Sequence, residues 1–243
     1  EYARAFAHLV QPLPCLMPLK VSGVRSPWIF GPALMMNELV SLDRNSGVPD
    51  AAHLPAGYLM SARRCREAIK PLADVEPAAG GVWWDAIVLD SGRMSIEPVL
   101  EASRLGAVVV NRVEAREYLI EQGKVVGARA LDRLSGRELE IRAKVTVNAS
   151  GPWAAELSRA SDLPEVELPR NWIGALNLVL RRSLGITKAV ALSSKSRAAD
   201  SSAVLKRAQR ELFFVPWRDV TMIGTDYHRV PSPLNGAPRF ASE

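Results

Sequence analysis

The 243-residue sequence predicts a mixed α/β or α+β fold. One apolar run is followed by a helical stretch and a second apolar run between residues 82 and 111. Residues 112–149 then contain strand-like segments joined by turns, and the last third is again rich in strand-like runs. Helices and strands that alternate around an antiparallel ribbon are typical of nucleotide-binding architecture.

The N-terminal part is predicted to be mainly helical and interrupted by prolines. A helix over residues 1–10 ends where the ring of Pro12 and of the prolines after it (Pro14 and Pro18) forbids its continuation. A second helix over 28–43 is expected to bury four apolar side chains: Phe30, Leu34, Leu39 and Leu42. Ser61 caps a third helix, which runs to about Ile69 with Cys65 one turn earlier.

Residues 82–111 are predicted to form a strand–helix–strand unit. VWWDAIVLD (82–90) is the first strand, and SIEPVLEASRL (95–105) is the helix. Gly106 follows at the helix end, where a left-handed residue is favoured. AVVVN (107–111) is short and continuously apolar, as in a strand buried on both faces. The order and the lengths predict a parallel crossover.

The remaining strands are predicted from alternation and from turn residues. An antiparallel meander covers residues 112–149, with turns at Gly123 and at Ser135-Gly136. The last third contributes four strands, over residues 175–182, 189–193, 211–217 and 220–225. Arg218-Asp219 forms a tight hairpin turn between the last two.

Composition excludes several classes of site. The net charge is +5 and the pI is near 9.5, but the arginines are dispersed and the aromatic residues do not interleave with a basic run. Nucleic-acid binding is therefore not expected. Cys15 and Cys65 lie in apolar stretches and are expected to be reduced and buried. The three histidines show no metal-ligand spacing.

The sequence also contains no apolar run of the roughly 18 residues that span a bilayer. We therefore expect a cytoplasmic location, with at most peripheral contact at the inner face of a membrane.

The stretch VTVNASGPWAAEL (145–157) is a candidate binding site. A predicted strand ends in Ala149, Ser150 and Gly151, and Pro152 suits the first position of a helix. A helix N-terminus at the carboxyl end of a strand is where phosphates bind in such sheets. Alternatively, the small residues only let strand and helix pack closely. The glycine-rich fingerprint G-x-G-x-x-G and the P-loop are both absent.

The hairpin ELFFVPWRDVTMIGTD (211–226) is the second candidate. Its aromatic and β-branched residues suit either a core or one wall of a pocket, with Arg210 or Arg218 meeting an anion. There is no G-x-S-x-G motif. Asp85 and Asp90 are expected to be caps at a strand end rather than paired catalytic carboxylates.

Taken together, these stretches resemble the flavin-dependent glycerol-3-phosphate dehydrogenases of the D-amino-acid-oxidase-like superfamily. The resemblance extends over residues 1 to about 230. The stretches that carry it, in order, are HLVQPLPCLMPL (8–19), WWDAIVLDSGRM (83–94), GAVVVNRVEA (106–115), GKVVGARALDRLSGRELEIRAKVTVNASGPW (123–153) and LFFVPWRDVTMIGT (212–225).

The resemblance implies a partial FAD-binding domain with an antiparallel meander, and a substrate domain with a mainly antiparallel sheet and helices. The implied boundaries are a helical cap segment (1–82), a portion of the FAD domain (83–160), a substrate-domain sheet (161–230) and a tail (231–243). The implied activity is oxidation of sn-glycerol 3-phosphate to dihydroxyacetone phosphate, with hydride transfer to FAD. The electrons would pass to a quinone or another acceptor.

The resemblance also implies site residues. Val113, Ala149, Ser150 and Gly151 would lie along the FAD, and Arg210 would face the substrate phosphate. Asn177 would lie in the substrate site, but it and Gly174 replace a histidine and a lysine of the family pattern, so a different substrate remains open. No catalytic residue is assigned by the resemblance.

Two alternatives stay open: an amine or amino-acid oxidase of the same superfamily, and a non-enzymatic binding module. Because the fingerprint is absent, we expect this chain to be an incomplete, inactive piece that binds FAD weakly or not at all. We also expect its uncovered sheet edges to favour a homodimer.

Overall fold

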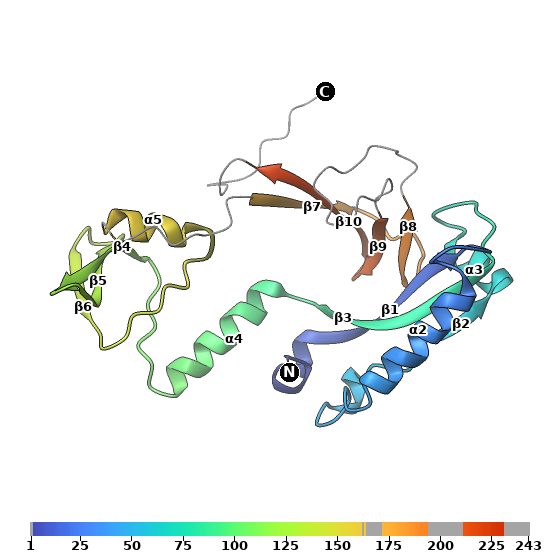
Figure 1. The fold of residues 1–243 in the computed structure, drawn as a ribbon, viewed down its shortest axis with the longest axis horizontal. Coiled ribbons are helices and arrows are strands. Elements are labelled where there is room, and N and C mark those ends of the chain that lie inside the picture. The colour runs from blue at the N-terminus through green and yellow to red at the C-terminus, as the bar shows by residue number, and fades with distance from the viewer. Residues whose placement is uncertain (1, 162, 164–171, 194–210, 231–243) are drawn as a thin grey trace. The chain divides into compact units, whose positions relative to one another are not determined.

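The structure is a computed structural model that describes residues 2–161, 163, 172–193 and 211–230 (Figure 1). It contains two compact units. The first comprises residues 1–98 and 175–227, and the second comprises residues 99–174 and 228–243. Each unit is described by itself below.

A seven-stranded sheet with the strand order β2-β3-β1-β8-β9-β10-β7 organises the first unit. Except for the parallel β1–β8 pair, every strand pair with a described register in this sheet is antiparallel. The strands are β1 (Val10–Leu19), β2 (Tyr58–Ser61), β3 (Ala79–Val88), β7 (Trp172–Leu180), β8 (Ala189–Ser193), β9 (Glu211–Trp217) and β10 (Val220–Val230).

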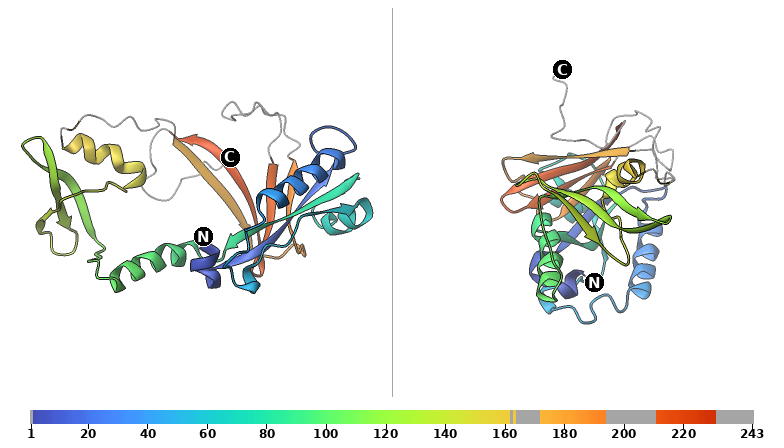
Figure 2. Two further views of the ribbon diagram at one scale, coloured as in Figure 1. Left: turned by 60° about the horizontal axis from the view of Figure 1, so that its bottom comes forward. Right: turned by 90° about the vertical axis from the view of Figure 1, so that its left-hand side faces the viewer.

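The N-terminal helix predicted over residues 1–10 is wrong. Helix α1 covers only Tyr2–Ala5, a 3₁₀ turn (η1, Ala7–Leu9) follows, and β1 begins at Val10. Strand β1 pairs with β3 along its whole length, as Figure 2 shows.

Strand β1 tolerates its prolines because their main-chain nitrogens, which have no hydrogen to donate, face away from β3. The carbonyls of Leu9 and Leu19 accept hydrogen bonds from Leu89 N (3.0 Å) and Ala78 N (2.8 Å), on the β3 side. Main-chain groups alternate along a strand, so the even-numbered prolines face β8 instead. There the register pairs only Cys15 with Ala189 and Leu16 with Val190. A proline costs no ladder hydrogen bond where no partner is paired.

The core of the first unit lies where β1, β3 and β8 meet helix α3 (Ala62–Ile69). Its buried residues are Leu16, Cys65, Ile69, Val82 and Val190. Gly80 of β3 permits this contact, because a Cβ there would lie 2.9 Å from Leu16 Cδ1 and 3.0 Å from Cys65 Sγ. The predicted cap is confirmed, since Ser61 Oγ accepts a hydrogen bond from Arg64 N at 3.5 Å.

Helix α2 (Pro27–Val40) confirms the second predicted helix, but only part of its predicted burial is correct. Leu34 is buried, whereas Leu39 and Leu42 are 64% and 83% exposed. The 3₁₀ turn η2 (Asp50–Ala52) interrupts the loop that leads to β2.

Helix α4 (Ser91–Arg104) follows β3, as predicted, and Gly106 adopts a left-handed φ of +95° just after it. The predicted strand over residues 107–111 is wrong. Residues 107–110 form no regular structure, and Val108 is 92% exposed. The predicted parallel crossover is therefore not formed either: β3 belongs to the seven-stranded sheet, and the next strand belongs to another sheet.

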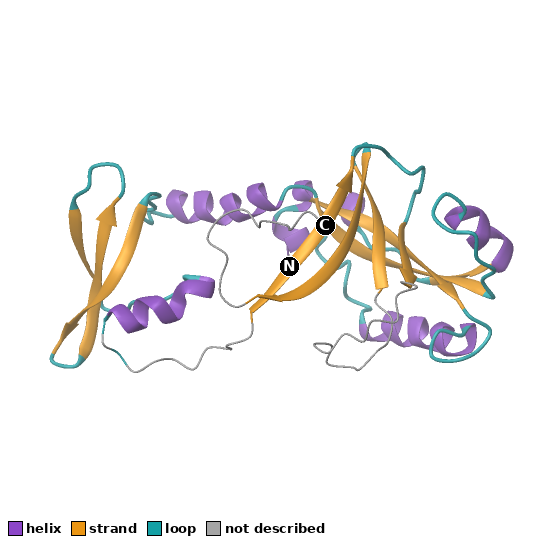
Figure 3. Cartoon of the chain, turned by 90° about the horizontal axis from the view of Figure 1, so that it is seen from above, coloured by secondary structure: helices purple, strands orange, loops and turns teal. Residues whose placement is uncertain are grey.

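The second unit contains the predicted antiparallel meander, in the order β4-β5-β6. Its strands are β4 (Val113–Glu121), β5 (Lys124–Asp132) and β6 (Glu138–Arg142). Both predicted turns are confirmed, with positive φ at Gly123 (+74°) and Gly136 (+72°). Helix α5 (Ala154–Ala160) contacts β4 and lies beside the three-stranded sheet in Figure 3, and Tyr118 N donates to Ser161 Oγ at 2.6 Å.

The last strand predicted for the meander extends too far along the chain. Strand β6 ends at Arg142, and the side chains of Val145 and Val147 are 77% and 80% exposed. VTVN is therefore an open segment of the chain and not a buried strand.

Within the described residues, no helix combines the length and the apolar character needed to cross a bilayer. Both cysteines are buried free thiols, as predicted.

Candidate functional site

The turn after VTVN, in the second unit, is held by the side chain of Asn148. Its Oδ1 accepts hydrogen bonds from Ser150 N (3.1 Å) and Ser150 Oγ (2.6 Å), and its Nδ2 donates to the carbonyl of Ala154 (3.1 Å). The 3₁₀ turn η3 (Gly151–Trp153) then leads into α5. Pro152 lies in this turn and not at the first position of the helix, where it was predicted, because α5 begins at Ala154.

The space around Gly151 distinguishes the two interpretations of these small residues. Gly151 has a φ of +57°, and a Cβ built on it would meet no atom within 4 Å. Ala149 and Ser150 are exposed. Close packing within the described chain therefore does not require small residues here. The backbone is instead open to an approaching group, which fits a cofactor that lies along it.

The proposed phosphate site at a strand–helix junction has less support. No strand precedes the turn, and α5 is only seven residues long. Val113, the other predicted FAD residue, is half-buried at the start of β4, where it pairs with Asp132. Val113 and the Ala149–Gly151 turn lie in the same unit, but their contact with FAD stays a prediction.

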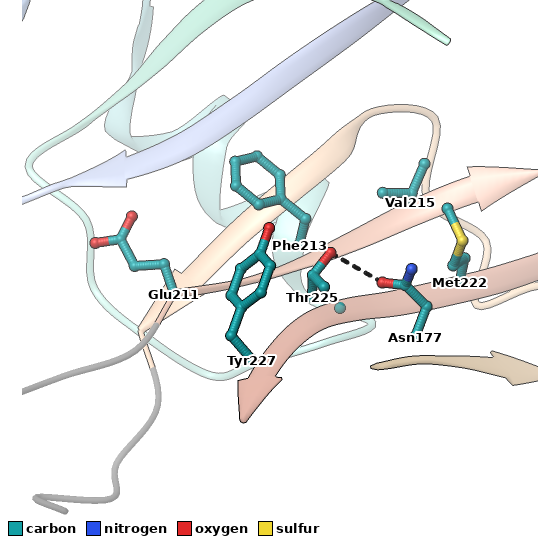
Figure 4. A pocket seen from close by; sticks show the side chains of 8 residues that line it. Asn177, Glu211, Phe213, Val215, Met222, Thr225 and Tyr227 are labelled. Carbon is teal, nitrogen blue, oxygen red and sulfur yellow. Dashed lines mark hydrogen bonds between the residues drawn. The ribbon is translucent and has the colours of Figure 1, made fainter. Parts of the chain in front are cut away.

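A pocket of about 330 Å³ lies on β7, β9 and β10 of the first unit (Figure 4). Strand β9 contributes alternate residues, which share one face of the sheet. The pocket has an apolar part and a polar part. Its lining residues are Asn177, Glu211, Phe213, Val215, Met222, Gly224, Thr225 and Tyr227.

Asn177 is fixed in the pocket by two neighbours on β10. The hydroxyl of Thr225 donates a hydrogen bond to Asn177 Oδ1 at 3.0 Å. A Cβ at position 224 would overlap this same oxygen, so the missing side chain of Gly224 makes room for the amide. In this arrangement the amide oxygen of Asn177 lies toward β10.

Glu211 and Phe213 are each held by a side chain from another segment of the first unit: Arg25, between β1 and α2, and Trp83 of β3. Glu211 forms an ion pair with Arg25, whose Nη1 also donates to Ser193 Oγ at 2.6 Å. Phe213 meets Trp83 of β3 edge to face, with ring centroids 6.4 Å apart. These contacts fix the β9 side of the pocket.

Of the two predicted substrate residues, Asn177 lines the pocket, and Arg210 lies outside the described residues. Arg218, the other arginine of the hairpin, does not line it. Its guanidinium stacks on Trp217 at 5.0 Å and donates to the carbonyl of Leu89 at 3.5 Å. The candidate hairpin 211–226 does contribute one wall of this pocket, but the sequence assigned no individual role to Glu211, Thr225 or Tyr227.

Asp90 caps the start of α4, as predicted, whereas Asp85 lies inside β3, where it pairs with Leu13, so its prediction as a strand-end cap is wrong. Asp90 Oδ1 accepts a hydrogen bond from Arg93 N at 2.9 Å, and Asp85 Oδ1 accepts one from Ala86 N at 2.8 Å. Among the described residues, no cluster of histidine, cysteine, aspartate or glutamate could hold a metal ion.

Neither cysteine is a nucleophile in the folded chain. Burial, with the nearby Asp85 carboxylate adding to it, raises the pKa of the Cys15 thiol from 9.0 to about 12. Burial also raises the pKa of Cys65. Both thiols therefore stay protonated near neutral pH, where a nucleophilic cysteine would need its thiolate form.

The Cys15 pKa predicts a loss of stability at alkaline pH. Unfolding lets the thiol ionise with its ordinary pKa, so the stabilisation is complete below pH 9.0 and is lost as the pH rises toward about 12. We expect the free energy of unfolding of Cys15→Ala to fall less steeply over this range than that of the unsubstituted chain. Urea titrations at several pH values measure it, and equal slopes would contradict the prediction.

Comparison with known proteins agrees with this fold. Residues 28–242 match the family described as FAD dependent oxidoreductase. Alpha-glycerophosphate oxidase of Streptococcus pyogenes is 31% identical over 144 residues, which is 58% of this chain and 23% of that protein. Glycerol-3-phosphate dehydrogenase of Mycobacterium leprae is 27% identical over 219 residues (90% and 33%). The mitochondrial glycerol-3-phosphate dehydrogenase of Mus musculus is 28% identical over 239 residues (93% and 30%).

The chain thus spans about a quarter to a third of the length of these relatives. Among solved structures, glycerol-3-phosphate dehydrogenase from Bacillus halodurans, complexed with FAD, matches with a TM-score of 0.63 and 22% identity, over 98% of this chain and 38% of that one. L-proline dehydrogenase from P. horikoshii matches with a TM-score of 0.60 and 14% identity, over 98% and 55%. These likenesses confirm the predicted α/β fold class. Because the family match extends over most of the sequence, this chain belongs to the FAD-dependent oxidoreductase family.

Proposed function

We propose that the full-length protein oxidises sn-glycerol 3-phosphate to dihydroxyacetone phosphate with FAD as its cofactor. The observation that carries the proposal is a small pocket, of about 330 Å³, in a chain whose similar relatives are named as oxidases or dehydrogenases of this compound. A pocket of this size suits a three-carbon substrate better than it suits a long, extended substrate.

The chain's own residues would divide the binding between two places. Val113 and the open turn Ala149–Gly151 would lie along the cofactor, because no side chain stands above Gly151. Asn177 and its neighbours on β9 and β10 would bind the substrate, and Arg210 would meet its phosphate as a bidentate guanidinium. When bound, FAD would supply the acceptor for the hydride that leaves C2 of the substrate while the C2 hydroxyl loses its proton.

Several finer points stay predictions: a cytoplasmic location, peripheral contact with a membrane, a quinone as electron acceptor, and a homodimer. The weak or absent FAD binding expected of this chain by itself is also a prediction. The predicted domain boundaries belong to the same group.

Anaerobic titration of the full-length protein tests the proposed activity. Glycerol 3-phosphate is expected to bleach the visible flavin absorbance and to yield dihydroxyacetone phosphate in equal amount. Glycine, proline and a panel of simple amines serve as the comparison, because amine oxidation is the alternative within the superfamily. Bleaching by an amine but not by glycerol 3-phosphate would overturn the proposal, and a flavoprotein reduced by neither would favour a binding role.

A further inference from the structure

The charges that line the pocket on β7, β9 and β10 determine which end of the substrate can bind there. The only ionised side chain among its described lining residues is the carboxylate of Glu211, and none of them is a lysine, arginine or histidine. The guanidinium of Arg25 is already paired with Glu211 and bonded to Ser193. The described lining residues and this ion pair together therefore carry no surplus positive charge.

A phosphate group would be poorly matched to this lining. A phosphate monoester carries a charge of about −1.5 to −2 near neutral pH, and it is ordinarily bound by cationic side chains or by several backbone N–H groups. Placed in this pocket, it would approach the Glu211 carboxylate and the apolar side chains of Phe213, Val215 and Met222. Both contacts are unfavourable for an anion.

The polar part of the pocket is instead suited to an uncharged hydroxyl group. Thr225 donates its hydroxyl proton to Asn177 Oδ1. Among the described residues, no acceptor is paired with the two N–H groups of Asn177 Nδ2. The side chains of Tyr227 and Thr225 project from β10 on the side of Phe213 (Figure 4), and Tyr227 is 54% exposed. Amide donors and a phenol that donates and accepts complement a hydroxyl, which also does both.

We propose that this pocket binds the uncharged, hydroxyl-bearing end of the substrate, and that Asn177 determines specificity by donating a hydrogen bond to the terminal C1 hydroxyl. The phosphate is bound outside the pocket. Thr225 and Gly224 act as positioning residues, since one holds the amide oxygen and the other leaves room for it. The inference rests on the proposed function, because it assigns the two ends of that substrate.

The test compares glycerol 3-phosphate with its 1-deoxy analogue, propane-1,2-diol phosphate, in the full-length protein. Asn177→Ala is expected to lower kcat/KM for glycerol 3-phosphate about tenfold, the usual effect of one lost neutral hydrogen bond. The same variant should change kcat/KM for the analogue by less than about twofold, because the analogue lacks the group that Asn177 binds. Inhibition by inorganic phosphate should be unchanged.

Leu178→Ala is the matched control, because Leu178 is the next residue of β7, is 58% exposed and does not line the pocket. It is expected to leave both kcat/KM values unchanged. An equal loss for both substrates in Asn177→Ala, or a weakened inhibition by phosphate, would overturn the inference.

If the unsubstituted protein oxidises neither compound, the proposed function is wrong. The assignment of the pocket is then tested separately, by calorimetric measurement of glycerol and phosphate binding. Glycerol that binds to the unsubstituted protein and not to Asn177→Ala would support it. Phosphate binding that is lost in the variant would overturn it, and so would a failure to bind glycerol at all.

Discussion

Gly127→Ala is expected to unfold the three-stranded meander. Gly127 lies within β5 with a φ of +154°, and a Cβ there would overlap the carbonyl oxygen of Ile141 in β6. The opposing atoms belong to the backbone, so no side-chain rotation relieves the overlap. We expect a loss of about 3 kcal/mol or more in the free energy of unfolding of this unit, which is large against the ~5–15 kcal/mol that stabilises a typical domain. Amide hydrogen exchange over residues 113–142 measures the loss.

Gly136→Ala is the matched control in the same sheet. Gly136 also has a positive φ, of +72°, but a Cβ there meets no atom within 4 Å. Only the left-handed conformation is then penalised, by about 1 kcal/mol. If the two variants exchange their amide hydrogens at the same rate, the prediction is wrong, because the overlap with β6 would then add nothing to the loss of stability.

Leu16→Ala is expected to be the most damaging truncation in the first unit. Leu16 is fully buried in β1 and belongs to the cluster that joins α3, β3 and β8. Removing a buried leucine side chain costs about 2–5 kcal/mol, since it loses the burial and leaves a cavity. Urea denaturation of the chain, followed by the fluorescence of its tryptophans, measures the change.

Leu39→Ala provides the comparison, because it makes the same chemical change at a site that is 64% exposed. It is expected to alter the free energy of unfolding by no more than about 0.5 kcal/mol. A similar loss in both variants would show that the fluorescence transition does not report on the core around Leu16.

Elements whose signals are local were predicted well from the sequence. Strands β8 and β9 were predicted with the bounds that the structure has, and α3 begins and ends where the Ser61 cap and the Cys65–Ile69 spacing indicate. The meander was found because glycine marks each of its turns. These features depend on residues that are close together in the sequence, so the sequence alone is enough to predict them.

The errors occurred where the outcome depends on a distant partner. Residues 107–110 and 145–148 have the apolar composition of strands, but no described strand pairs with them, so Val108 and Val147 stay exposed. Strand β1 was missed for the opposite reason. Its prolines argue against regular structure until the register shows that they face the sparsely paired side.

The candidate site was predicted only in part for the same reason. Asn177 came from the family resemblance, and its replacement of a histidine was visible in the sequence. Thr225 and Tyr227 were missed because their relation to Asn177 needs β10 to lie beside β7 in the sheet. The alternation of Glu211, Phe213 and Val215 was available as a signal for one face of β9.

The narrow β1–β8 pairing has a consequence for the order of folding. It joins two parts of the sheet, β2-β3-β1 and β8-β9-β10-β7, through two described residue pairs that are far apart in the sequence. Closing so long a loop costs entropy before the contacts form, whereas the β9–β10 hairpin closes locally. We therefore expect the two parts of the sheet to form first and to join late, when Leu16 meets Val190 in the core.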